Sequence, residues 1–331
     1  MNSSFQPHCR RHQTRILAVL LALTLSACGG DDSKPVIPLP AAIPVGNSTP
    51  EDITADGDRA FVSNLTDGSV TRIDLANGGA ASIFVPPATD SYSSAWGLRI
   101  VPSKNWLLSI QNPPYDFNPA HAGTGRVVAF DLDTGTKIKS WDLPADTVGN
   151  SLDVDKSGNI YVGDFGPHTR IVKIDAQTNA VSIWATDSRW VDNSFGFGGL
   201  VYSGTGLYAA HDNKLWFIAI HSDGTPAAPA VVSIAGNPVI FADGMTWTGS
   251  GIDYSYNDLF VAGNHGVAYR VDFSDPTTGV QTVLETDLAD PSGMTTATVN
   301  GKTYLLVNES QLGEAGPPDL PYVVKTFLLA P

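Results

Sequence analysis

The chain after residue 45 alternates short apolar segments with polar or glycine-containing turns. One unit recurs six times, and each copy opens with a tripeptide whose third residue is apolar. These third residues are Ile53, Leu98, Leu152, Leu200, Met245 and Met294, at spacings of 45, 54, 48, 45 and 49 residues. No segment after residue 28 shows sustained helical periodicity. The pattern therefore predicts β-strands in a repeat of about 45–50 residues.

Each copy also contains a second pair of strand-like segments. Clear examples are 69–75 with 81–85, 126–132 with 137–143, 170–176 with 180–185, and 267–273 with 280–286. The short polar stretches between them have the composition of hairpin turns. Four short strands per period are typical of a β-propeller blade. We therefore expect an all-β fold, a six-bladed β-propeller of four-stranded blades over residues 46–331. The sixth copy lacks an outer strand, which a segment within 36–45 can supply.

The first 45 residues have a different character. Three arginines precede a ten-residue apolar segment, 16–25, which is too short for a permanent membrane span. The following residues, Leu25-Ser26-Ala27-Cys28, resemble a bacterial lipobox. The resemblance implies a signal peptide over 1–27, acylation of Cys28, and a tether over 28–45. Gly29 is compatible with sorting to the outer membrane of the bacterial cell envelope. An ordinary signal peptide with an incidental cysteine is the alternative.

Charge and cysteine content narrow the classes of partner. The full chain has a net charge of −14, and removal of residues 1–27 takes away three arginines and no acid, which leaves −17. Such a surface disfavours nucleic acid and anionic lipid, so membrane contact is expected through the lipid anchor only. The two cysteines are Cys9 and Cys28, so the mature chain has no thiol nucleophile beyond its anchor. A small molecule or a protein remains as partner.

The first residues of the six opening tripeptides define a candidate site. They are expected to surround one mouth of the central tunnel, and they are Glu51, Trp96, Asn150, Gly198, Asp243 and Ser292. Loops between the second and third strands should open on the same face, and they carry polar residues such as His211, His265 and Asn308. We take Trp96, Tyr115 and Asn308 as candidate substrate-binding residues, because a propeller builds its site from groups gathered at one mouth.

Three segments, 50–53, 150–162 and 242–245, resemble the senescence marker protein/gluconolactonase/luciferin-regenerating-enzyme family. Its members are six-bladed propellers that hydrolyse lactones, esters or phosphotriesters with a metal, usually Ca²⁺, held at the tunnel. The resemblance implies that Glu51, Asn150 and Asp243 are metal ligands. The chain departs from the family in blade four, where Gly198 replaces an asparagine. Asn193 or a water molecule would have to supply the missing ligand.

The implied ligands suit a hard cation. Ca²⁺ binds carboxylate and amide oxygens, and two carboxylates with one amide leave positions for water and substrate. The oxygen ligands do not distinguish Ca²⁺ from another divalent cation. In this interpretation Asp243 is also the catalytic base or nucleophile, and His211 or His265 transfers protons.

Two hypotheses about function follow. The first is a metal-dependent hydrolase of lactones or esters at the cell envelope. The alternative is a non-enzymatic propeller at the cell surface that binds a ligand or a protein. Gly198, Trp96 and the long loops 111–124 and 308–321 favour the alternative.

Overall fold

The computed structural model describes residues 37–116, 118–191, 195–236, 242–256, 266–313 and 316–329. These residues belong to one compact unit, Val36–Pro331. The predicted signal peptide and Cys28 lie outside the described residues, as do Asn193 and His265.

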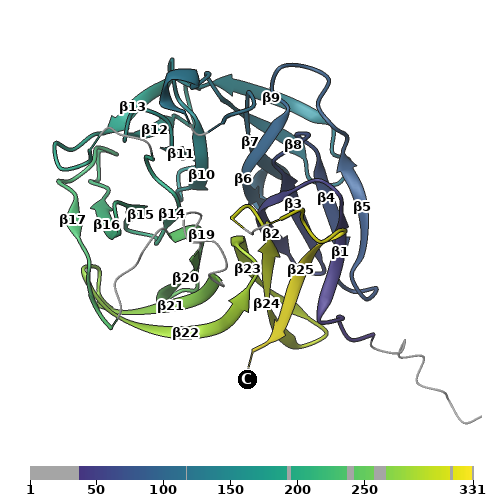
Figure 1. Cartoon of the computed structure of the whole chain (residues 1–331). Coiled ribbons are helices and arrows are strands. Elements are labelled where there is room, and N and C mark those ends of the chain that lie inside the picture. Colours follow the sequence, from purple (N-terminus) through teal and green to yellow (C-terminus); the bar gives the residue numbers. More distant parts are fainter. Residues whose placement is uncertain are drawn as a thin grey trace, which may run out of the picture. The chain divides into compact units, whose positions relative to one another are not determined.

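Six sheets form the unit, and each is built mainly from consecutive antiparallel strands. Figure 1 shows them arranged around a common centre, which confirms the predicted six-bladed propeller. The strands of the first three blades are, in blade one, β2 (Pro50–Asp56), β3 (Arg59–Asn64), β4 (Val70–Asp74) and β5 (Ala80–Val85); in blade two, β6 (Ser94–Val101), β7 (Trp106–Asn112), β8 (Arg126–Asp131) and β9 (Lys137–Asp142); and in blade three, β10 (Gly149–Val154), β11 (Ile160–Asp164), β12 (Ile171–Ile174) and β13 (Val181–Ala185).

The last three blades are less regular. Blade four has β14 (Leu200–Tyr202), β15 (Gly206–His211), β16 (Lys214–Ala219) and the two-residue β17 (Ala230–Val231). Blade five has β19 (Ala242–Trp247), β20 (Gly251–Tyr256), β21 (Gly266–Asp275) and β22 (Thr278–Leu288). A further strand, β18 (Ser233–Ala235), pairs parallel with β22, so this blade has five strands where four were expected.

Blade six combines the two ends of the propeller. It contains β23 (Pro291–Val299), β24 (Lys302–Glu309) and β25 (Tyr322–Leu328), and its outer strand is β1 (Ala42–Gly46). β1 pairs antiparallel with β25, with Ala42 opposite Lys325. The expectation that a segment within 36–45 completes this blade is therefore confirmed, and the pairing covers an edge that would otherwise be open.

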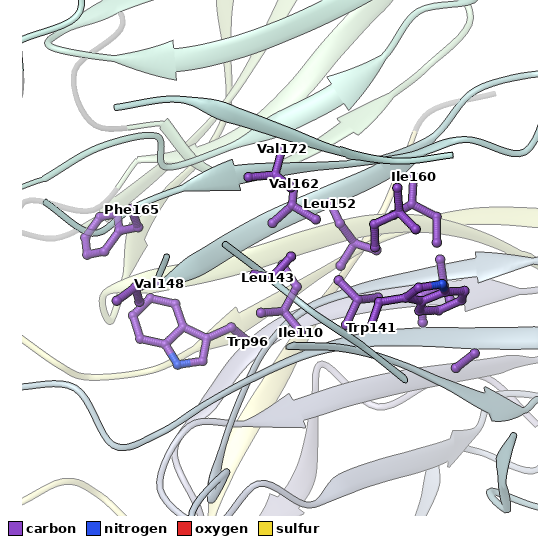
Figure 2. Close-up of a cluster of buried hydrophobic side chains, with 14 of the residues drawn as sticks. Trp96, Ile110, Trp141, Leu143, Val148, Leu152, Ile160, Val162, Phe165 and Val172 are labelled. Carbon is purple, nitrogen blue, oxygen red and sulfur yellow. The ribbon is translucent and has the colours of Figure 1, made fainter. Parts of the chain in front are cut away.

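The core consists of six hydrophobic clusters, each lying between two adjacent blades. Figure 2 shows the cluster between blades two and three, where Trp96, Val148 and Phe165 lie together at one end. Each of the six third residues contributes to, or packs against, a different cluster. The 45–50-residue period therefore reflects one buried interface per blade, and each buried leucine or phenylalanine contributes roughly 1.5–3 kcal/mol.

Helical structure is limited to two 3-10 turns in the described ranges, η1 (Pro102–Lys104) and η2 (Pro119–His121). No described helix is long and apolar enough to cross a membrane.

Candidate functional site

A β-bulge lies at the start of the inner strand in five blades. In β2, Pro50 pairs with Asn64 but Ile53 pairs with Val62, so the register shifts at Glu51 and Asp52. The inner strands β6, β10, β19 and β23 shift at the corresponding two residues. A bulge inserts one extra residue and redirects its side chain. The repeated bulge therefore places the first residues of the tripeptides at the same level around the tunnel.

The middle residue of each tripeptide packs against the next blade. A Cβ atom added to Gly293 would lie 2.7 Å from the Cα atom of Asp52, and one added to Gly244 would lie 2.5 Å from the Cα atom of Gly293. Both distances are too short for a side chain. The Asp243-Gly244 pair is therefore part of a bulge in which glycine allows the backbones of two blades to touch.

Two blades replace this glycine with a polar residue that bonds to the neighbouring blade. Asp52 Oδ2 accepts a hydrogen bond from the Leu98 N–H group at 2.7 Å. Ser151 Oγ donates to the Gly198 carbonyl oxygen at 2.9 Å. Direct contacts and hydrogen bonds between bulges thus fix the mouth of the tunnel.

Glu51 is buried at this mouth. Its Oε2 atom has no hydrogen-bond partner among the described residues. Burial raises the pKa of Glu51 well above its ordinary value, and the carboxylates of Asp243 and Asp52 raise this pKa further. The ionised form of Glu51 therefore lacks a compensating positive charge.

Asp243 and Asn150 lie beside Glu51. Desolvation and the charge of Asp52 together raise the pKa of Asp243 to about 7, while a hydrogen bond from the Asn150 side chain opposes the rise. Asn150 is buried, and its Nδ2 also lies 3.4 Å from the Phe197 carbonyl oxygen. The structure therefore brings together the three residues predicted as metal ligands.

Sequence reasoning assigned no role to the charged residues directly beneath this group. Burial raises the pKa of Asp52 to about 6, while hydrogen bonds from the Leu98 and Ile53 N–H groups and the charge of Arg99 oppose the rise. Arg99 also forms an ion pair with buried Asp153, with Nε 2.7 Å from Oδ1. The feature of the sequence that could have identified these residues is the occurrence of charged residues inside otherwise apolar inner strands.

The oxygen atoms at the mouth fit a divalent cation. Glu51 and Asp243 bring two carboxyl groups beside the Asn150 amide, and one Glu51 oxygen has no partner among the described residues. Carboxylate and amide oxygens are the ligands that Ca²⁺ prefers. Blade four adds no side chain, and the Gly198 carbonyl accepts a hydrogen bond from Ser151. No group of three or more histidine, cysteine, aspartate or glutamate side chains with metal-binding geometry occurs in the described part of the chain. The protein would therefore supply only a few of the ligands of a cation bound here.

His211 ends the second strand of blade four and is buried. Its Nδ1 atom lies 3.0 Å from the Gly196 carbonyl oxygen, which can only accept, so Nδ1 carries a proton. Nε2 has no partner among the described residues. In the neutral ring Nε2 is the free base. The second predicted histidine, His265, lies outside the described residues.

Aromatic side chains from blades two and three gather beside the mouth. The Trp96 ring centroid lies 5.7 Å from that of Phe165, which lies 5.4 Å from that of Phe195. Trp96 is buried and its Nε1 donates to Ser94 Oγ at 2.7 Å. Tyr115 packs, half-buried, against the same cluster. The third candidate substrate-binding residue, Asn308, is fully buried in blade six and does not belong to this aromatic group.

The tunnel narrows below the bulges. All six third residues line one cavity of about 20 Å³, together with polar residues that include Asp52, Arg99 and Ser151. This volume holds about one water molecule. A molecule larger than water therefore does not fit in this cavity.

Comparisons with known proteins agree with this architecture. No protein-family model and no curated protein matches the chain. Among solved structures, the major allergen Mala s 1 of Malassezia sympodialis superposes with a TM-score of 0.68 at 17% identity, over 87% of this chain and 96% of that chain. The calcium-binding protein regucalcin of Agrobacterium tumefaciens gives 0.57 at 14% identity, over 88% and 95%. A gluconolactonase of Xanthomonas campestris gives 0.50 at 14% identity, over 89% and 99%. The chain has the propeller fold of these proteins.

Proposed function

We propose that this protein is a divalent-cation-dependent hydrolase of lactones or esters, with Ca²⁺ as the first cation to test. The observation that carries the proposal is the proximity of Glu51 and Asp243 at the mouth. Glu51 Oε2 has no hydrogen-bond partner among the described residues, and the pKa of each carboxyl group is raised. A propeller fold shared with a calcium-binding protein and a gluconolactonase supports it.

Each residue has a defined task in this proposal. Glu51, Asn150 and Asp243 would hold the cation, which when bound would polarise the carbonyl oxygen of the substrate. Asp243 would also accept the proton of an attacking water or act as nucleophile, once the cation has displaced the proton that Asp243 carries without metal. His211 Nε2 is the second proton acceptor, and the aromatic rings of Trp96 and Phe195 would contact the apolar part of the substrate.

The test is a calorimetric titration of Ca²⁺ into metal-stripped protein that lacks residues 1–28. Wild type should bind about one equivalent, and Asp243→Ala should not bind. Hydrolysis of a panel of lactones and aryl esters should depend on the cation and be lost in the same variant, while circular dichroism of the variant stays unchanged. Turnover by Asp243→Ala at the wild-type rate would refute the assigned role.

We further propose that the protein is anchored to the bacterial outer membrane through Cys28. The lipobox-like segment before this residue supports the proposal. Cells grown with a clickable fatty acid should label wild type but not Cys28→Ala, and only wild type should fractionate with the outer membrane. Equal labelling of the two proteins would contradict it.

The second candidate is a non-enzymatic binding propeller at the cell surface. Gly198 favours it, because blade four supplies no side-chain ligand to the mouth and its carbonyl oxygen is bonded to Ser151. Absence of Ca²⁺ binding and of turnover, together with retention of a ligand or protein from the native cell envelope, would establish this function instead.

A further inference from the structure

Asn308 near the end of β24 is an exception among the buried amides. Its side chain is 0% exposed, yet neither Oδ1 nor Nδ2 has a hydrogen-bond partner among the described residues. Buried polar groups are nearly always hydrogen-bonded, because an unpaired one costs free energy. By contrast, the buried amide of Asn112 in blade two bonds at both ends, to the carbonyl and N–H groups of Gly149. Asn308 therefore requires an explanation.

The repeat shows which way this side chain faces. Asn308 follows Val307, the partner of Met294, so it lies opposite the bulge of its blade. The equivalent residues in blades two and five are Ile110 and Ser255. Both contact the inner strand of the following blade.

The contacts of these two residues are specific. Ile110 lies against Gly149 at the start of blade three, and Ser255 Oγ donates to the Ser292 carbonyl oxygen of blade six at 2.9 Å. The blade that follows blade six is blade one, and the corresponding segment there contains Pro50 and Glu51. β24 and β2 are in contact. Asn308 therefore lies in a strand that borders the segment carrying Glu51.

Other unpaired atoms lie along the same interface, which we call the seam between blades six and one. Glu51 Oε2 and Asn64 Oδ1 are both buried and without partners among the described residues. Asn64 belongs to the seam because its Nδ2 donates to Thr71, whose hydroxyl donates to the Val45 carbonyl oxygen of β1. Three buried side chains with unpartnered oxygen atoms, Glu51, Asn64 and Asn308, thus occur along this seam.

We propose that Asn308 Oδ1 is a ligand of the cation at the tunnel mouth, supplied by blade six in place of the side chain that blade four lacks at Gly198. This inference rests on the proposed cation site. It gives the cation four protein oxygen donors, from Glu51, Asn150, Asp243 and Asn308, and water completes the six to eight positions that Ca²⁺ prefers. It also explains why blade six has an unpaired buried amide at this position, although blades two and five have Ile110 and Ser255 at the equivalent position.

The test compares two substitutions at Asn308 with a matched control. Asn308→Leu removes the amide at similar size, and Asn308→Asp replaces it with a carboxylate. The control is Asn159→Leu, because Asn159 is a buried amide at the other end of blade three whose groups bond to Asp155 and Ala176. Each protein is measured for Ca²⁺ affinity by calorimetry at pH 8 and for urea unfolding without metal.

A ligand role predicts a specific combination of results. Asn308→Leu should bind Ca²⁺ about tenfold more weakly or worse, while its urea midpoint without metal stays the same or rises. Asn308→Asp should bind Ca²⁺ more tightly, and Asn159→Leu should lower the urea midpoint without changing the affinity.

Other results would overturn the inference in distinguishable ways. Wild-type affinity in Asn308→Leu, or a loss of stability like that of Asn159→Leu, would assign Asn308 a structural role and leave the proposed cation site standing. Weaker binding by Asn308→Asp would show that the amide donates to Glu51 and does not ligate the cation. No binding by wild type would remove the cation site and the inference together.

Discussion

The metal-free protein should become more stable when Asp243 is replaced by asparagine. Burial and the charge of Asp52 raise the pKa of Asp243 from 3.8 to about 7, so the folded protein binds this proton more tightly than the unfolded chain does. As pH rises above about 4 the unfolded chain ionises first, and folding loses free energy until the pH passes 7. Asparagine removes this loss and keeps an acceptor for the Asn150 side chain.

The magnitude follows from the size of the pKa shift. A rise of about three units corresponds to roughly 4 kcal/mol at pH 8, and to only about 2 kcal/mol at pH 5, where folded Asp243 is still protonated. Asp243→Asn should therefore gain roughly 4 kcal/mol over wild type at pH 8 in the absence of metal, and about half of that at pH 5. Ca²⁺ should cancel this gain at pH 8, since wild type alone would bind it, and a thousandfold excess over Kd adds about 4 kcal/mol to wild type.

The assay is urea unfolding followed by tryptophan fluorescence, with chelator and with excess Ca²⁺, at pH 5 and pH 8. Asp142→Asn is the control, because Asp142 is exposed on β9 and its replacement should change the free energy of unfolding by less than about 0.5 kcal/mol. Equal or lower stability of Asp243→Asn at pH 8 with chelator would refute the reasoning, as would a difference that does not grow between pH 5 and pH 8.

Three further predictions concern the site, an ion pair and the seam. Ca²⁺ binding near pH 6.5 should release protons, because Asp243 has a pKa of about 7 without metal. Calorimetry in buffers of different ionisation enthalpy measures the number of protons released. A heat of binding that does not depend on the buffer would contradict the prediction. Arg270→Leu should destabilise the fold by about 3–5 kcal/mol in urea unfolding, because it leaves fully buried Asp253 without its two hydrogen bonds of 2.6 and 2.7 Å. The control is Arg189→Leu, which should cost less than about 1 kcal/mol because Arg189 is exposed. Ile43→Ala should cost roughly 2–5 kcal/mol in the same assay, because this 0% exposed side chain of β1 packs in the seam, and a change below 1 kcal/mol would show that β1 contributes little to closure.

The sequence was sufficient for the fold because its period has a physical cause. Each third residue, from Ile53 to Met294, packs at one of six equivalent interfaces, so the apolar pattern reports the number of blades directly. The pairing of β1 with β25 was predictable because the last copy was one strand short. β18 was not predictable, since its pairing depends on the outer edge of β22, which it joins at Thr278 to Val280, and not on any pattern of its own.

The candidate site was predictable only in part. Glu51, Asn150 and Asp243 occupy equivalent positions in three copies, and the bulges bring them to one level. Their roles stay predictions until a cation is tested, as does the role of His265. The charge network of Asp52 and Arg99 could not be read from sequence, because it depends on side chains of different blades that become neighbours only in the closed ring.

The pairing of β1 with β25 also determines the order in which the chain can fold. Ala42 lies opposite Lys325, so nearly the whole chain must be synthesised before β1 has a partner. Contacts between such distant residues form slowly, because closing a long loop costs entropy before any contact compensates for it. Blades one to five can assemble from neighbouring segments while β1 is still unpaired, and blade six is completed last. Because β2, which carries Glu51, contacts β23 and β24 across that final interface, the mouth of the tunnel takes its finished shape only when the ring closes.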